Sequence, residues 1–136
     1  PGLSSSALIE TVDLFPTIVE LAGLPAPQGP QPIDGDSFVP ILRGDNSDIG
    51  EYDYHCFPRG NRLGRAIRTS RFRLVEWKLL NGNAEPQYEL YDYHTDPHEM
   101  KNLVSELPDV ARKLTAILAS QPAAVTTKNS RRRPTK

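Results

Sequence analysis

The sequence has few cysteines, no long apolar run and little net charge, and each of these features excludes some classes of protein. It contains a single cysteine, Cys56, so it can form no internal disulfide. It has no apolar run that approaches the roughly 20 residues of a membrane-spanning helix. Its charges almost cancel, with a formal net charge of −1 at pH 7, so no overall field favours nucleic acid or an anionic membrane. We therefore expect neither nucleic acid nor a membrane as its partner.

What the sequence does contain is enough for one modest domain. It has 136 residues, of which 38% are hydrophobic, and this composition can form a core of limited size. It begins with Pro1 instead of Met and shows no signal-peptide pattern. We expect that the true N-terminus lies upstream, so the missing signal says little about compartment.

The first third of the chain predicts two helices around a loop. Residues 7–12 are expected to form a short strand. Apolar residues recur at helical spacing over 13–22, and Gly23 is suited to end that helix. Residues 25–36 contain four prolines and two glycines, which predicts a loop, and 37–42 then predict a short helix.

The remainder predicts an α+β fold. Aromatic and β-branched residues favour strands at 52–57, 65–69, 72–77 and 88–92. Apolar residues at helical spacing favour a closing helix over 107–120. Because no crossover helices separate the strands, we expect a small antiparallel sheet of about four strands with one C-terminal helix.

One stretch, His55–Arg62, has the outline of a cysteine-dependent phosphatase loop. Cys56 is followed six positions later by arginine, as in loops where a thiolate attacks phosphorus and amides hold the phosphate. However, Pro58 has no N–H to donate, and the residues after the stretch predict strands instead of the helix that such a loop precedes. The phosphatase loop remains an alternative to be tested by the fold.

Two other regions have alternative interpretations. The carboxylates and imidazoles of Asp92, His94, Asp96, His98 and Glu99 are possible metal ligands, but an Asp-Pro turn explains the same composition. The final stretch, 121–136, is polar and basic and predicts a disordered tail. Its run of three arginines leaves open a non-catalytic, anion-binding module.

Four segments, in this order and spacing, have a family likeness: 12–25, 35–42, 66–74 and 89–103. They resemble the C-terminal portion of the sulfatases, which belong to the alkaline-phosphatase-like superfamily. The stretch His55–Arg59, just before Ile67–Arg68–Thr69, looks most like the iduronate-2-sulfatase branch. Cys56 begins like the sulfatase motif Cys-x-Pro-Ser-Arg, but Arg59 and Gly60 stand where that motif has Ser and Arg. We therefore expect Cys56 to remain unmodified.

The resemblance implies a division of the chain. Residues 1–50 are expected to be the edge of a catalytic α/β domain, an orphaned helix and loop, while 51–120 form the sulfatase C-terminal subdomain and 121–136 the tail. It also implies that the formylglycine, the calcium and the cationic catalytic residues lie in the missing N-terminal part. This fragment would then hold no catalytic residue, cofactor or metal, and its partner would be that missing domain. A periplasmic, secreted or lysosome-like compartment is what the family implies.

The same resemblance suggests which residues touch substrate. His55, Arg59 and Arg62 concentrate positive charge within eight residues that follow a predicted strand. Arginine can hold a sulfate or carboxylate through two parallel hydrogen bonds. We expect these three residues to line the rim of the active site and to help bind a sulfated sugar.

Overall fold

The computed structural model describes residues 2, 4–26, 28–30, 32–45 and 49–123. It divides into two compact units, one made of 1–53 with 68–72 and the other of 54–67 with 73–136. None of the helices in the described ranges is both long and apolar enough to cross a bilayer.

In the first unit, the described residues between 4 and 45 form short helices and loops, with no strand among them. A 3-10 turn, Thr11–Asp13, leads into α1, Leu14–Leu21, and α2 follows at Val39–Leu42. The two predicted helices are confirmed, but the strand expected over 7–12 is wrong. The cause is local: the Asp13 carboxylate accepts the Glu10 N–H at 2.7 Å, and this reciprocal capping box turns the backbone instead of extending it.

The loop after α1 is held against the start of that helix by side chains. Asp13 accepts the Asp36 N–H at 3.0 Å. Thr17, which is buried, donates to the Asp13 carbonyl at 2.7 Å and accepts the Phe38 N–H at 3.0 Å. Two small polar side chains therefore satisfy backbone groups that would otherwise lack partners in a proline-rich segment.

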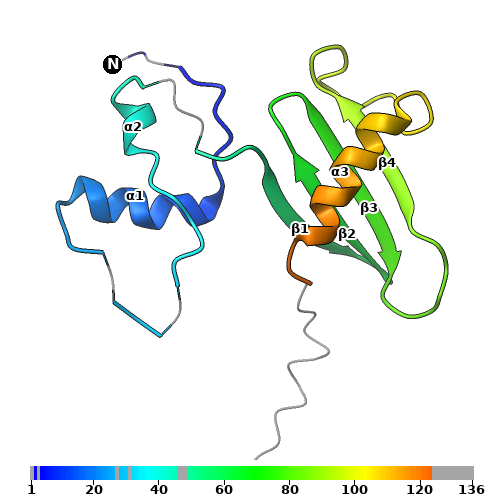
Figure 1. The fold of residues 1–136 in the computed structure, drawn as a ribbon, viewed down its shortest axis with the longest axis horizontal. Helices are drawn as coiled ribbons and strands as arrows, with labels where there is room; N and C mark the ends of the chain where they lie inside the picture. The colour runs from blue at the N-terminus through cyan, green and yellow to red at the C-terminus, as the bar shows by residue number, and fades with distance from the viewer. Residues whose placement is uncertain (1, 3, 27, 31, 46–48, 124–136) are drawn as a thin grey trace, which may run out of the picture. The chain divides into compact units, whose positions relative to one another are not determined.

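The second unit is built on a four-stranded antiparallel sheet (Figure 1). Its strands are β1, Asp53–Arg59, β2, Arg62–Arg68, β3, Phe72–Leu79, and β4, Gln87–Asp92, in the order β1-β2-β3-β4. β1 and β2 are joined by two residues, the first of which is Gly60 at a φ of 60°. Primed hairpin turns need such a positive φ.

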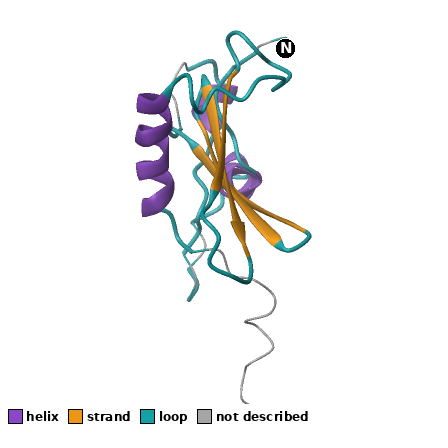
Figure 2. Ribbon diagram, turned by 90° about the vertical axis from the view of Figure 1, so that its right-hand side faces the viewer, coloured by secondary structure: helices purple, strands orange, loops and turns teal. Residues whose placement is uncertain are grey.

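One helix closes the sheet. α3, Pro108–Ser120, lies along one face (Figures 1 and 2). The core between helix and sheet consists of almost fully buried side chains from each layer: Ile67, Leu74, Leu90, Leu114 and Leu118. Burial of each such side chain contributes about 1.5–3 kcal/mol. The predicted α+β fold, with four strands and a C-terminal helix, is confirmed.

The outer edge of β4 is covered by the segment that follows it. Asn102 accepts the Leu90 N–H at 2.9 Å and donates to the Tyr88 carbonyl at 3.1 Å. The Leu103 N–H donates to the Leu90 carbonyl at 2.8 Å. An edge whose backbone groups are already paired is protected against pairing with another chain.

Candidate functional site

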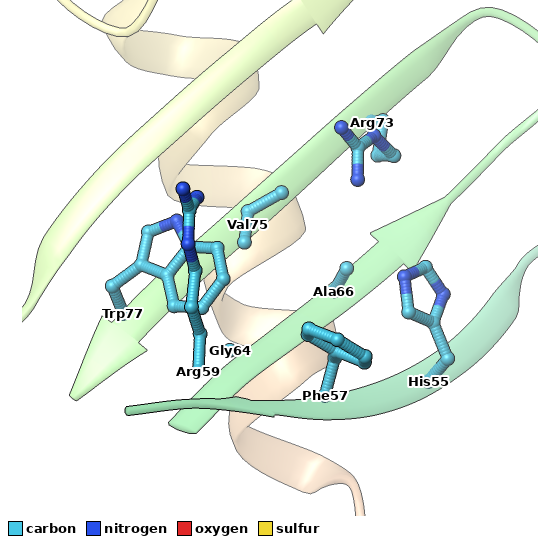
Figure 3. A pocket seen from close by; sticks show the side chains of 8 residues that line it. All are labelled: His55, Phe57, Arg59, Gly64, Ala66, Arg73, Val75 and Trp77. Carbon is cyan, nitrogen blue, oxygen red and sulfur yellow. The ribbon is translucent and has the colours of Figure 1, made fainter. Parts of the chain in front are cut away.

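The face of the sheet opposite α3 holds a pocket of about 370 Å³. Figure 3 looks onto this face, with α3 behind the strands. The lining side chains come from alternate positions of three neighbouring strands: His55, Phe57 and Arg59 of β1, Gly64 and Ala66 of β2, and Arg73, Val75 and Trp77 of β3. Because side chains alternate between the two faces of a strand, these eight residues share one face.

The floor of the pocket is apolar. Ala66 and Val75 are buried, with 1% and 4% of their surface exposed. Trp77 lies directly against Gly64: a Cβ added at Gly64 would stand 2.7 Å from the indole ring. Glycine is therefore the residue that lets this ring approach the backbone of β2 so closely.

One basic side chain of the pocket is rigidly held. Arg73 forms a two-point ion pair with Glu99, which also accepts a hydrogen bond from the Tyr93 hydroxyl. The Arg73 guanidinium lies 5.6 Å from the centre of the Tyr91 ring. Burial would lower the pKa of Arg73, but its hydrogen bonds to Glu99 outweigh this and raise that pKa further, so the guanidinium stays charged.

Glu99 itself has an unusual backbone. Its φ is 56°, the only positive value for a residue other than glycine in the described part of the chain. Such a conformation is uncommon for a side chain of this kind and is held only when its surroundings require it. The ion pair to Arg73 is the contact that anchors Glu99 to the sheet.

The structure brings together two of the three residues predicted to bind substrate. His55 and Arg59 line the pocket, and both are exposed. Arg62 does not line it; its guanidinium donates to the side chain of Gln87 on β4. The stretch His55–Arg62 was expected to follow a strand. It instead forms most of β1, the tight turn and the first residue of β2.

Among the lining residues that were not predicted from the sequence, Arg73 and Trp77 have the largest side chains. Both lie on β3, the second strand after β1 in the chain. Their alternation along β3 was a detectable signal, but only the pairing of β3 with β2 shows that they face His55 and Arg59.

The structure does not favour the phosphatase alternative. Cys56 lies in the middle of β1, and its position between His55 and Phe57 turns its thiol to the other face of the sheet. There its sulfur donates to the Tyr54 hydroxyl at 3.0 Å. β1 runs through a two-residue turn into another strand, so no helix N-terminus follows to hold a phosphate.

The acidic and imidazole cluster after β4 forms a turn, as the Asp-Pro interpretation predicted. Asp92 accepts the His94 N–H at 3.0 Å, and Asp96 accepts the Lys101 N–H at 2.9 Å. Glu99 is committed to the arginine described above. Within the described residues, no three His, Cys, Asp or Glu side chains are placed to hold a metal ion.

Solved structures show which class of protein has this architecture. A protein solved in complex with its substrate D-glucosamine-2-N,6-O-disulfate matches with a TM-score of 0.63 and 26% identity, over 79% of this chain and 22% of that one. A 2-O GAG sulfatase matches with a TM-score of 0.62 and 29% identity, over 79% of this chain and 23% of that one. The sheet and its helix thus have the architecture of part of a sulfatase.

The sequence gives the family. Residues 1–124 match the model of "N-sulphoglucosamine sulphohydrolase, C-terminal", and the chain belongs to that family. The resemblance to sulfatases is thereby confirmed.

Individual sulfatases show the same likeness over part of their length. The ulvan-active sulfatase of Formosa agariphila is 33% identical over 138 residues, which covers 80% of this chain and 27% of that protein. Arylsulfatase K of Danio rerio is 29% identical, over 88% of this chain and 23% of that protein. The Δ4,5-hexuronate-2-O-sulfatase of Bacteroides thetaiotaomicron is 35% identical, over 71% and 19%. The chain therefore spans about a quarter of the length of these relatives.

Proposed function

We propose that this chain is the C-terminal portion of an enzyme that hydrolyses the sulfate ester of a sugar. The observation that carries the proposal is the family match over residues 1–124. In this proposal 1–50 complete the edge of the catalytic domain and 51–120 form the C-terminal subdomain. The tail, 121–136, lies outside the described residues from 124 onward.

The chain supplies packing and part of the substrate pocket, and the missing domain is its partner. Calcium and a formylglycine are proposed for that missing domain, because the residues here do not suit them. The carboxylates after β4 are committed to turn and ion-pair contacts. Cys56 lies in a strand, and Arg59 and Gly60 stand where the modification motif needs Ser and Arg. No step of the reaction is assigned to this chain.

His55 and Arg59 are proposed to hold the anionic group of the sugar at the rim of the pocket. The structure gives Arg59 no ion-pair partner among the described residues, so its guanidinium is available to a ligand. Arg62 takes part less directly, since Gln87 already accepts one of its hydrogen bonds. A charged hydrogen bond to sulfate or carboxylate is stronger than a neutral one.

A sugar acid carrying a 2-O-sulfate is the substrate we favour, as in the iduronate-2-sulfatase branch. The support is the likeness to a hexuronate-2-O-sulfatase and to a 2-O GAG sulfatase. The basic character of the pocket suits such a substrate, because none of the eight lining residues is acidic.

The test is Arg59→Ala in the complete enzyme. We expect kcat/KM to fall by about 10- to 150-fold for the acidic sugar, the effect of losing about 1.5–3 kcal/mol of charged hydrogen bonding. A small neutral aryl sulfate should be much less affected. Arg112→Ala is the matched control, because Arg112 lies on the exposed side of α3 in a surface pair with Asp109. Equal losses on both substrates would indicate a structural role for Arg59, and no loss on either would contradict the proposal.

A further inference from the structure

Trp77 and Gly64 meet on the face of the sheet opposite α3. They line the pocket there, together with the buried Ala66 and Val75, and lie apart from the core between helix and sheet. Trp77 is partly exposed, and its ring lies so close to β2 that even a methyl group at Gly64 would displace it. A large ring that is held against a strand and left partly open to solvent can serve as an aromatic platform for a ligand.

We propose that Trp77 is a stacking platform for a sugar ring, and that the pocket is a subsite for one ring of a negatively charged saccharide. The inference rests on the proposed function. It adds that Trp77 recognises the sugar ring, whereas the proposed function concerned only the anionic group of the sugar. The C–H face of a pyranose ring is apolar and packs on an aromatic face, while the hydroxyl and sulfate groups around its edge need polar partners.

The remaining walls of the pocket fit such a ligand. Phe57, whose surface is 61% exposed, stands on β1, so an aromatic side chain lies on each side of the Gly64 floor (Figure 3). His55 and Arg59, which both come from β1, provide hydrogen-bond donors in the pocket. A volume of about 370 Å³ falls in the range of about 300–1,000 Å³ that is typical of ligand pockets.

The charge of the pocket favours an acidic sugar over a neutral one. His55, Arg59 and Arg73 contribute basic groups, and no carboxylate belongs to the lining. Arg73 is already neutralised by Glu99, which leaves Arg59 as the guanidinium that can meet a sulfate or a carboxylate. Ring and anion would thus be recognised by different residues, Trp77 and Arg59.

Trp77 is the only tryptophan in the sequence, so its fluorescence reports on this pocket alone. The chain would be titrated with N-acetyl-D-glucosamine 6-sulfate, with unsulfated N-acetyl-D-glucosamine and with inorganic sulfate. We expect a saturable change of Trp77 emission with the sulfated sugar, and at least tenfold weaker responses to the other two. Gly64→Ala keeps the tryptophan but displaces it, and should weaken binding of the sulfated sugar.

Substitutions then separate the platform from the anion site. Trp77→Leu should weaken binding of the sulfated sugar by about tenfold, and Trp77→Tyr should restore most of it, as measured by ligand-observed NMR. Arg59→Gln should remove the preference for the sulfated over the unsulfated sugar. Circular dichroism checks that each variant is folded, and for any variant that aggregates the same comparison is made through KM in the complete enzyme.

The outcomes distinguish the two ideas. If Trp77→Leu binds as tightly as the unchanged chain while Arg59→Gln binds less tightly, the platform is overturned and the proposed anion site stands. If Arg59→Gln has no effect while Trp77→Leu does, the anion site fails and the platform stands. If no sugar binds, and Trp77 becomes inaccessible to acrylamide quenching only in the complete enzyme, the pocket is a docking surface for the missing domain and the inference is overturned.

Discussion

Arg65 donates two hydrogen bonds to a single oxygen of Glu76, at 2.9 and 2.7 Å, across strands β2 and β3. The Tyr88 hydroxyl donates to the other oxygen at 3.0 Å, and the Lys78 ammonium lies 3.1 Å from it. The Glu76 side chain is only 4% exposed. Burial raises the pKa of this carboxyl, but the hydrogen bonds from Arg65, Lys78 and Tyr88 outweigh it and lower that pKa. The buried Glu76 carboxylate is thus held by one partner from each of β2, β3 and β4.

Glu76→Gln should destabilise the sheet unit by about 2–4 kcal/mol, because it leaves the Arg65 guanidinium without its counter-charge. Chemical unfolding followed by Trp77 fluorescence measures this, since Trp77 lies on the same strand. Glu106→Gln is the control: Glu106 also forms an ion pair, with Lys101, but both side chains are more than half exposed, so its loss should change stability by less than about 1 kcal/mol. Equal effects of the two substitutions would contradict the account.

The same carboxyl predicts the acid sensitivity of the sheet. The folded-state pKa of Glu76 lies below its usual value of 4.5, so the stability it contributes is fully present above about pH 4.5. It is lost as the pH falls through the lower folded-state pKa. Unfolding free energies measured from pH 6 to pH 3 should therefore decrease less steeply in Glu76→Gln than in the unchanged chain. Identical slopes would show that Glu76 is not the group responsible.

Gly35 is predicted to be essential to the first unit. A Cβ at this position would lie 2.2 Å from the Val12 carbonyl oxygen, which belongs to the backbone and cannot rotate away. Gly35→Ala should therefore separate the loop from the start of α1 and destabilise that contact by about 1–3 kcal/mol or more. Hydrogen exchange at the Asp36 amide, which Asp13 accepts, should become faster. Gly50→Ala is the control, because its nearest neighbour would lie 3.7 Å away; equal exchange in both variants would contradict the prediction.

Local patterns predicted most elements of the fold. The aromatic residues of 52–57 and the helical spacing that begins at Pro108 each carry their own signal within one segment. The strand predicted over 7–12 was wrong because the apolar pattern of this stretch favours a strand, whereas in the structure the Asp13 carboxylate accepts the Glu10 N–H and turns the backbone.

The residues of the site could be predicted only in part, because they come from different strands. His55 and Arg59 are close in sequence, so the sequence alone indicated a local concentration of basic side chains. Arg73 and Trp77 join them because β3 pairs with β2, whereas Arg62 donates to Gln87 on β4, two strands away. Strand register depends on contacts between segments, which a single sequence does not display.

The exposed side of α1 should make the isolated chain prone to association. Phe15, Ile18 and Leu21 expose 53%, 62% and 58% of their surfaces, and apolar patches of this kind mark interfaces or aggregation sites. Replacing Ile18 and Leu21 by lysine should raise the soluble yield of the isolated chain. In the complete enzyme the same double substitution should lower the yield, because α1 is proposed to pack against the catalytic domain. A monodisperse, unchanged chain by light scattering would count against this.

The isolated chain should not hydrolyse an aryl sulfate, even with calcium present. The residues of suitable chemistry are committed elsewhere: the carboxylates of Asp92 and Asp96 accept turn hydrogen bonds, and the thiol of Cys56 donates to Tyr54 from the middle of a strand. The pocket can bind an anion through Arg59, but binding without a nucleophile or a polarising ion gives no acceleration of the chemical step. The assay compares the chain with its Cys56→Ala variant, and with a complete sulfatase as positive control. Turnover above background that disappears in Cys56→Ala would show that the chain is catalytic in its own right, and would overturn the assignment of the chemistry to the missing domain.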